Sequence, residues 1–359
     1  MPVLAALEEP PELAQETVFF VWQGAVILPL ALFVQYIPSR TARNWKSEAE
    51  VCETRTHRGS KRRLRPRLST GILTCLLLVS SSTAAASPRE GQAVSGFAEV
   101  NGTRLYYEDS GTGRPVVFIG VGAGMDHRLW DDQFSVFARR FRVMRYDIRG
   151  WGKSAWPTES FSPLEDLAAL LDFLKIERTC VVGLSFGGAL AIDFAIAHPE
   201  RVACLVLVAP GLSGWQFSEG FQRRYGPVIA ALQAGDTERY VQLLLDDPIL
   251  LPAKKNPAVR EKAKRIWAEN SKLPNVVPLG LDPPARNRLS EIHVPTLIVL
   301  GDHDAPDLYE IAQLLETEIA GARRVTIPDA GHTVNWETPK EFNRTVLEFL
   351  SGLETSSPK

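Results

Sequence analysis

From about residue 97 onward, the chain alternates between apolar runs of strand length and stretches with helical spacing. The strand-like runs lie at residues 115–120, 141–147, 179–184, 202–209, 296–300 and 324–327. The helical patterns lie at residues 164–174, 188–197, 308–319 and 339–350. Apolar strands separated by helices are typical of a mostly parallel sheet covered on both faces. This alternation predicts an α/β domain, opened by a hairpin at residues 96–109 around Asn101-Gly102.

One stretch interrupts the alternation. Residues 213–292 contain helical patterns at 217–245 and 257–271 and no clear strand. We therefore predict a helical cap inserted into a core made of residues 97–212 and 293–352. In open α/β sheets, ligands bind outside the carboxyl ends of the strands, so we expect the cap to lie over that edge.

The first part of the chain carries two targeting signals. Residues 18–37 are apolar and long enough to be a membrane-span candidate, although Pro29 and two glutamines weaken that interpretation. Residues 61–86 have a basic start, a short apolar centre and the small residues Ala84-Ala85-Ala86, which is the layout of a secretory signal peptide.

Two interpretations of this region compete. In one, residues 1–60 are an extension that anchors the protein in a membrane and leaves the C-terminal domain outside. In the other, which we favour, translation starts downstream of Met1 and residues 61–86 are a signal peptide. Both predict an extracytoplasmic catalytic domain, either secreted or periplasmic, or membrane-anchored.

Composition excludes some classes of protein. The chain has 40 Lys and Arg against 42 Asp and Glu, which gives no reason to expect nucleic-acid binding. The four cysteines, Cys52, Cys75, Cys180 and Cys204, show neither a CxxC spacing nor a Cys/His metal pattern. We expect them to be buried, inert thiols, and we expect no metal.

The strongest chemical signal is Gly183-Leu184-Ser185-Phe186-Gly187. It follows a β-type run and precedes a helix rich in alanine, which is the setting that a GxSxG nucleophile turn requires. The turn exposes the hydroxyl, and the helix N-terminus favours developing negative charge. These features predict that Ser185 is a nucleophile.

A serine hydroxyl needs a general base and an acid that orients the base. Among six histidines, His332 lies in a polar turn between a strand and a helix, so it is the candidate base. Three carboxylates, Asp302, Asp304 and Asp307, follow the strand at 296–300 and compete for the role of the acid. The residues alone do not choose among them.

Four segments together resemble the α/β-hydrolase superfamily, in the branch with esterases, enol-lactonases and cofactor-free haloperoxidase-like enzymes. Residues 146–154 look like its YDxRGxGxS segment and residues 183–188 like its nucleophile elbow. Residues 295–304 look like its PTLxxxGxxD strand, and Gly331-His332 like its GH pair. The resemblance implies an α/β-hydrolase fold, assigns Asp304 as the acid, and gives Asp147 and Arg149 a structural role in their loop.

The oxyanion loop departs from the family pattern. Val121 stands where the family often has histidine, and Gly122 keeps the glycine. The resemblance implies that the backbone N–H groups of Ala123 and Phe186 form the oxyanion hole. Aromatic side chains could line the pocket, but core or cap packing is their more common fate; they are Trp130, Trp151, Trp215, Phe217, Tyr225, Trp267 and Trp336.

These inferences lead to a serine hydrolase that cleaves a small ester or lactone through an acyl-enzyme, with a small-molecule substrate and without a cofactor. Two alternatives remain open. One is C–C bond hydrolysis or haloperoxidase-like chemistry on the same triad. The other is a ligand-binding, receptor-like protein with slow turnover. Fold alone does not choose among them.

Overall fold

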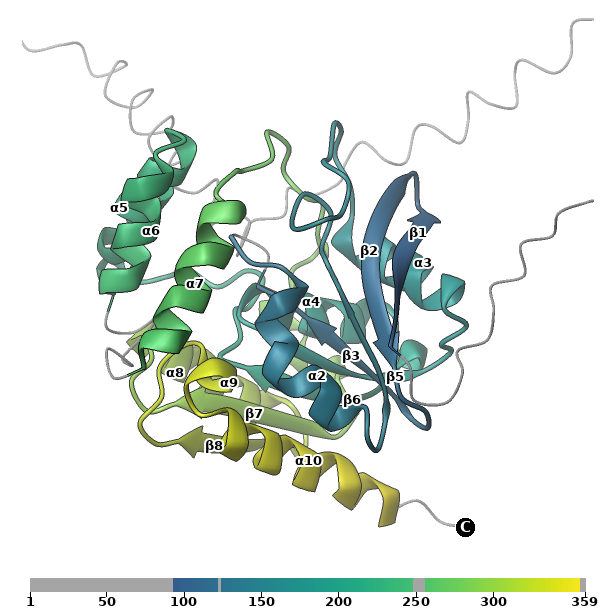
Figure 1. Ribbon diagram of the computed structural model, residues 1–359. Coiled ribbons are helices and arrows are strands. Elements are labelled where there is room, and N and C mark those ends of the chain that lie inside the picture. Colours follow the sequence, from purple (N-terminus) through teal and green to yellow (C-terminus); the bar gives the residue numbers. More distant parts are fainter. Residues whose placement is uncertain (1–92, 122–123, 248–255, 356–359) are drawn as a thin grey trace, which may run out of the picture. The chain divides into compact units, whose positions relative to one another are not determined.

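The structure, a computed structural model, describes residues 93–121, 124–247 and 256–355. Within these residues, the strands form one eight-stranded sheet in the order β1-β2-β4-β3-β5-β6-β7-β8 (Figure 1). The β1–β2 and β2–β4 pairings are antiparallel, and the remaining pairings are parallel. The strands are β1 (Val94–Val100), β2 (Thr103–Ser110), β3 (Pro115–Ile119), β4 (Arg142–Tyr146), β5 (Thr179–Leu184), β6 (Val202–Val208), β7 (Thr296–Gly301) and β8 (Arg323–Ile327). The predicted fold class is confirmed.

Helices cover both faces of the sheet and also form the insertion. They are α2 (Asp131–Phe137), α3 (Pro163–Phe173), α4 (Phe186–Ala197), α5 (Glu219–Gln233), α6 (Thr237–Asp246), α7 (Pro257–Glu269), α8 (Pro306–Glu318), α9 (Val334–Glu337) and α10 (Pro339–Thr355). Short 3₁₀ turns include η1 (His127–Trp130) and η3 (Ala285–Asn287). The sequence analysis did not predict the short helices α2 and α9.

The core consists of two apolar layers, one on each side of the sheet. Helices α3, α4 and α8 contribute to one layer, and α2, α10 and the cap contribute to the other. Successive side chains of a strand point to opposite faces, so Val181 of β5 joins the first layer while its neighbour Val182 joins the second. Burial on both sides explains why these strands are continuous apolar runs in the sequence.

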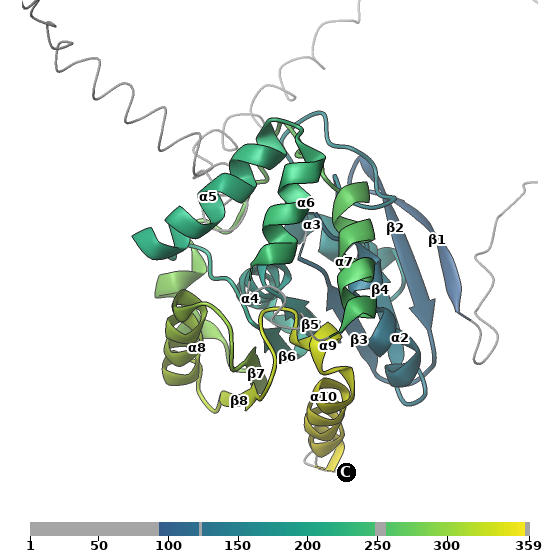
Figure 2. The same ribbon diagram turned by 60° about the vertical axis from the view of Figure 1, so that its left-hand side comes forward.

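The insertion contains the three helices α5, α6 and α7, which lie side by side in Figure 2. The predicted pattern at 217–245 is divided in two, because Gly235 adopts a positive φ of 70° after α5. Asp236 then begins α6 by accepting a hydrogen bond from the Arg239 N–H at 3.0 Å. A glycine that ends one helix and an aspartate that caps the next are typical boundary residues.

The two ends of the insertion are joined through Ser213, which binds a buried carboxyl of α4. The Ser213 hydroxyl donates to Asp193 Oδ1 at 2.6 Å and accepts from the Ala285 N–H at 2.8 Å. The Arg286 N–H also donates to the Ser213 carbonyl at 3.1 Å. Residue 213 leaves the core and residue 285 returns to it, so this one point fixes where the cap begins and ends.

The expectation of inert thiols is wrong for one pair of cysteines. Cys180 of β5 and Cys204 of β6 are buried, as expected, but they form a disulfide. They occupy paired positions on adjacent strands with their Cα atoms 4.5 Å apart, which is within the range that a disulfide spans. The sequence separation of 24 residues gave no hint of this proximity.

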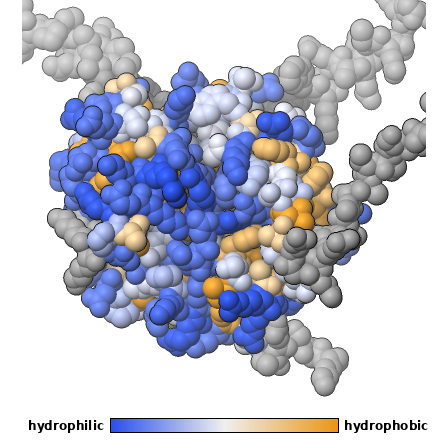
Figure 3. Space-filling view, in the orientation of Figure 1, coloured by the Kyte–Doolittle hydropathy of each residue, from blue (hydrophilic) through white to orange (hydrophobic). Residues whose placement is uncertain are grey.

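The predicted N-terminal segments, residues 1–60 with the apolar stretch 18–37 and residues 61–86, lie outside the described residues, as do Cys52 and Cys75. Within the described part of the chain, no helix combines the length and apolarity that crossing a bilayer requires. The face in Figure 3 is mostly hydrophilic, with small and separate apolar patches.

Candidate active site

Ser185 lies on the sharp turn between β5 and α4. Its backbone has φ 56° and ψ −112°, a combination that costs a residue with a side chain on the order of 1–3 kcal/mol. The Ser185 N–H donates to the Val208 carbonyl at 2.9 Å, and the Ser185 carbonyl accepts from the Gly211 N–H at 2.9 Å. The strained turn is therefore held from β6, and it places Ser185 at the N-cap of α4.

Glycines make this turn sterically possible. A Cβ atom on Gly183 would lie 2.1 Å from the Gly187 carbonyl oxygen, and one on Gly187 would lie 2.5 Å from the Ile119 carbonyl oxygen. A Cβ atom on Gly188 would lie 2.7 Å from Pro210 Cβ. Strand β5, helix α4 and the end of β3 thus approach one another more closely than any side chain permits.

His332 lies in the loop between β8 and α9 and contacts Asp304. Its Nδ1 atom is 3.1 Å from Asp304 Oδ2 and 3.2 Å from Oδ1. The Asp304 side chain is fully buried, and its Oδ1 also accepts from the Ala305 N–H at 2.7 Å. An ionised carboxylate only accepts hydrogen bonds, so Nδ1 carries the proton and Nε2 is the free basic nitrogen.

The three candidate acids have different hydrogen-bond partners. Asp302 Oδ1 accepts from the Ala330 N–H at 3.1 Å, and Asp307 accepts from the N–H and hydroxyl of Ser218 at 2.6 and 2.8 Å. Asp304 is the one of the three whose carboxylate is hydrogen-bonded to His332. Asp302 instead fastens the loop before His332, and Asp307 fastens the segment that leads into the cap.

Topology brings the serine, the acid and the base to one edge of the sheet. Ser185, Asp304 and His332 follow β5, β7 and β8, and these strands and β6 run parallel to one another. Their carboxyl ends therefore lie at the same edge. This is the chain order Ser, Asp, His that α/β-hydrolases share.

The charges around His332 favour its protonated form. Burial by itself would lower the pKa of His332, but the charge and hydrogen bond of Asp304, together with the charges of Glu337 and Asp247, raise it above its usual value. The imidazole of His332 is therefore able to hold an additional proton, as a candidate general base must. Sequence reasoning missed Glu337 and Asp247, because neither forms part of a recognisable motif.

The two predicted oxyanion donors are placed differently. Phe186 is the first residue of α4, directly after Ser185, so its N–H lies in the N-terminal turn of that helix. Ala123 lies outside the described residues. The adjoining Gly124 has a φ of 80°, and a Cβ atom there would lie 2.0 Å from the Tyr240 hydroxyl oxygen of α6. The cap therefore packs directly against the end of this loop.

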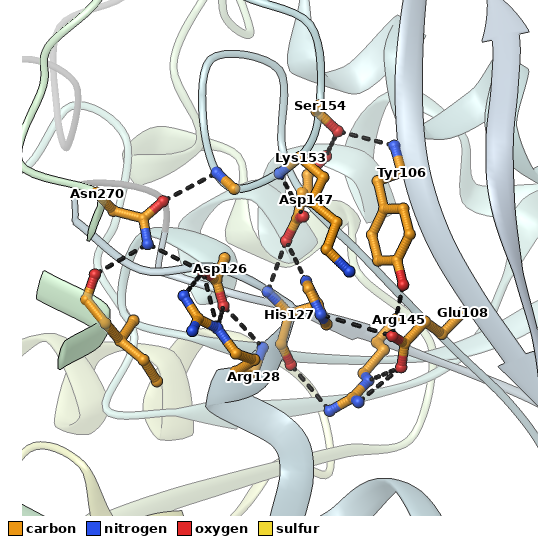
Figure 4. A network of polar contacts seen from close by, with 12 residues as sticks. Tyr106, Glu108, Asp126, His127, Arg128, Arg145, Asp147, Lys153, Ser154 and Asn270 are labelled. Atoms are coloured by element: carbon orange, nitrogen blue, oxygen red, sulfur yellow. Dashed lines mark hydrogen bonds and ion pairs between the residues drawn. The ribbon is translucent and has the colours of Figure 1, made fainter. Parts of the chain in front are cut away.

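A polar network joins the loops after β3 and β4 (Figure 4). Asp147 accepts from the N–H and Nδ1 of His127 at 2.6 and 2.8 Å and from the Lys153 N–H at 2.9 Å. Asn270, at the end of α7, donates to Asp126 at 2.9 Å and accepts from the Gly152 N–H at 2.9 Å. This network connects the cap to both loops.

Asp126, His127 and Asp147 place one potential metal-ligand atom each within 4.8 Å of the others. Those atoms are already engaged, because Arg128 and Asn270 bind Asp126 while His127 binds Asp147. We therefore describe the group as structural. Arg149 is likewise structural, since it forms a buried ion pair with Asp166 at 2.6 Å.

The aromatic candidates divide into two groups. The buried ones belong to the two core layers: Trp130, Trp151, Phe217, Trp267 and Trp336. Trp215 and Tyr225 are partly buried. Burial and the nearby charges of Asp247 and Asp304 raise the pKa of the Tyr225 hydroxyl well above its usual value, so this ring of α5 stays neutral beside the candidate acid.

Comparison with known proteins agrees with the fold. The model of the alpha/beta hydrolase family matches residues 116–345. A 2-hydroxy-6-oxononadienedioate/2-hydroxy-6-oxononatrienedioate hydrolase of Paraburkholderia xenovorans is 30% identical, and the match covers 76% of this chain and 98% of the relative.

Two solved structures are also similar. The enol-lactonase from Burkholderia xenovorans LB400 has a TM-score of 0.60 at 27% identity and covers 71% of this chain and 100% of its own. Est816, described as an N-acyl homoserine lactone degrading enzyme, has a TM-score of 0.59 at 29% identity with the same two coverages, 71% and 100%. Taken with the strand–turn–helix at Ser185 and the order of the sheet, these matches show that the chain belongs to the alpha/beta hydrolase family.

Proposed function

We propose that this hydrolase cleaves a small ester or lactone through an acyl-enzyme formed on Ser185, with His332 as base and Asp304 as the acid that orients it. The observation that carries the proposal is the buried Asp304 carboxylate on His332 Nδ1, at the sheet edge where the strained Ser185 turn lies. The similarity to two lactone-cleaving enzymes supports the substrate class.

The reaction follows from the free nitrogen of His332. Nε2 accepts the hydroxyl proton as Ser185 Oγ attacks the carbonyl carbon, and it gives that proton to the leaving oxygen when the C–O bond breaks. His332 then takes a proton from the water that attacks the acyl-enzyme, and it returns this proton to Ser185 Oγ as the acyl C–O bond breaks and the acid is released. The N–H groups of Phe186 and Ala123 stabilise the oxyanion, and one such donor is worth about 3 kcal/mol.

The test is hydrolysis of short- and medium-chain p-nitrophenyl esters and of aliphatic lactones by the wild-type chain and by Ser185→Ala. We expect release of product by the wild type and its loss in the variant.

The similarity to the P. xenovorans hydrolase favours a second candidate, cleavage of a C–C bond in a 2-hydroxy-6-oxo-dienoate on the same triad. Turnover of that substrate with ester and lactone activity absent would replace the first proposal by the second. A folded wild type that is stabilised by these compounds but turns none over would favour a receptor-like protein.

We also propose that the catalytic domain works outside the cytoplasm, either released after signal-peptide cleavage or anchored through residues before 61. The signal-peptide layout of residues 61–86 supports this proposal. So does the Cys180–Cys204 disulfide, because disulfides persist in oxidising compartments and are rare in the cytosol.

A further inference from the structure

Glu337, the last residue of α9, contacts the loop that carries His332 on both sides of the histidine. One carboxylate oxygen accepts from the Gly331 N–H at 3.1 Å. The other accepts from the Thr333 hydroxyl at 3.1 Å. One carboxylate thus spans the residue immediately before His332 and the residue immediately after it.

We propose that Glu337 is a positioning residue for the general base: it fastens the turn around His332, and its charge acts on the imidazole that Asp304 orients. The proposal rests on the function proposed above, since it concerns the same base.

The backbone at Ala330, before His332, is bonded to residues that follow β7. Glu337 is bonded to the turn itself, at Gly331 and Thr333. The His303 N–H donates to the Ala330 carbonyl at 2.9 Å, and Asp302 accepts from the Ala330 N–H at 3.1 Å. A Cβ atom on Gly301 would lie 2.2 Å from the same carbonyl oxygen, so the loop passes directly over the end of β7. The His332 turn is therefore held to β7 on one side and to α9 by Glu337 on the other.

The electrostatics agree with this geometry. Burial raises the pKa of Glu337 to about 7, although the hydrogen bonds from Gly331 and Thr333 and the charge of His332 lower it. Glu337 is in turn one of the groups that raise the pKa of His332. Two ionisable groups whose charges interact have coupled proton equilibria, so a change at Glu337 is measurable at His332.

Other charged groups face this pair from neighbouring elements. Asp304 after β7 and Asp247 at the end of α6 both raise the pKa of His332. Lys262 of α7 lies over the ring of Trp336, the residue before Glu337, and is ion-paired with Asp131 and Asp132. Glu337 is thus one of three carboxylates that act on His332, and among those three it is the one that is bonded to the residues on both sides of the histidine.

The variants Glu337→Gln and Glu337→Ala distinguish the effect of the Glu337 charge from the effect of its hydrogen bonds to Gly331 and Thr333. Glutamine keeps one accepting oxygen and loses the charge, whereas alanine loses both. Glu341→Gln is the matched control, because Glu341 is an acid of α10 that is ion-paired with the exposed Arg344. The full chain is used throughout, and thermal unfolding of each variant establishes that it is folded before its kinetics are compared.

Two readouts are measured: the pH profile of kcat and KM with a p-nitrophenyl ester, and the titration of the His332 imidazole by ¹H–¹⁵N NMR, assigned with His332→Gln. We expect kcat to fall between about tenfold and 10²-fold, more in the alanine than in the glutamine variant, because a small displacement of a catalytic group has that cost. KM should change little. Loss of the Glu337 charge should lower the His332 pKa, so the acidic limb of the profile moves to lower pH.

An unchanged His332 titration in both Glu337 variants would overturn the proposal, whatever the effect on kcat, because a merely structural residue would behave in that way. Wild-type kcat in Glu337→Ala would overturn it as well. If the wild type hydrolyses neither esters nor lactones, the proposed function fails by itself, and the NMR titration still decides whether Glu337 acts on His332.

Discussion

The chemistry of the site depends on which nitrogen of His332 is free. Because the buried Asp304 carboxylate holds Nδ1, the basic Nε2 is the nitrogen that the proposed reaction uses to take the proton of the Ser185 hydroxyl. The neighbouring acids are tied elsewhere: Asp302 binds the backbone of Ala330, and Asp307 binds Ser218. Three carboxylates that look equivalent in the sequence therefore have three different partners.

This difference predicts unequal effects of one chemical change at two neighbouring positions. Asp304→Asn should lower kcat for ester hydrolysis by about 10⁴-fold, because an amide stabilises the wrong tautomer and no imidazolium. Asp302→Asn should cost less than about tenfold, since its carbonyl oxygen still accepts from the Ala330 N–H. Steady-state kinetics of the two folded variants provide the comparison. Equal losses would remove the assignment of Asp304 as the acid.

Among the elements, the cap has an unusual attachment. Its two ends are joined through Ser213, whose hydroxyl accepts from the Ala285 N–H and donates to Asp193. Asp193 is fully buried, and its Oδ2 has no partner among the described residues. Burial raises the pKa of Asp193 to about 7, although the Ser213 hydrogen bond and the Arg288 charge lower it. The neutral acid is therefore the form that fits this junction.

The sign of the resulting pH dependence follows from linkage. The folded state holds the proton more tightly than the unfolded chain, so the stabilisation is present below about pH 4 and is lost as pH rises to about 7. The full loss is on the order of 4 kcal/mol. Relative to wild type, Asp193→Asn should gain free energy of unfolding across this window and level off above it.

Denaturant unfolding at several pH values measures this difference, with Asp172→Asn as the control, because Asp172 is an exposed acid that is ion-paired with Arg201. A wild type and an Asp193→Asn variant whose free energies of unfolding stay parallel from pH 4 to pH 8 would contradict the expectation.

The elements that the sequence predicts well are those with a simple local cause. Strands β3 to β7 are apolar because both faces of the sheet are covered, and the Ser185 turn is marked by glycines that no other residue could replace. The break at Gly235 falls inside one continuous helical pattern, so periodicity alone did not locate it.

The parts that the sequence did not predict depend on contacts between distant segments. The Cys180–Cys204 bond requires the register of β5 against β6, and the Asp193–Ser213–Ala285 junction joins a helix to both ends of an insertion. Likewise, the partners of Asp302, Asp304 and Asp307 follow from how the loops after β7 and β8 pack. None of these contacts produces a periodic pattern in the sequence, because each joins residues that are far apart along the chain.

At the scale of the whole molecule, the Cys180–Cys204 disulfide bears on the compartment in which the protein is proposed to work. In the described residues, the disulfide joins the strand that leads to Ser185 to its neighbour β6, inside the core. Closing a loop of this length typically stabilises a protein by about 3 kcal/mol. An oxidising compartment would let the bond form as the domain folds.

We therefore expect protein recovered from its natural compartment to resist alkylation at Cys180 and Cys204 when it is denatured without reductant, and to react at both after reduction. Peptide mass spectrometry distinguishes the two states, and N-terminal sequencing of the same sample locates the mature start, expected near Ser87. Full alkylation without reductant would argue against the extracytoplasmic proposal. Recovery of peptides from residues 1–50 would exclude the downstream start.

The junction at Asp193 has an evolutionary consequence. A segment whose entry and exit meet at one point can be exchanged as a cassette more readily, because a replacement does not have to match the spacing between two separate attachment sites. A replacement would still have to pack against the loops after β3 and β4, as Tyr240 and Asn270 do here. The elbow, in contrast, is so crowded at Gly183, Gly187 and Gly188 that almost any drift there would disturb Ser185. Lineages that share this architecture would therefore acquire new substrates by exchanging the segment between residues 213 and 285, while the residues that perform the chemistry stay the same.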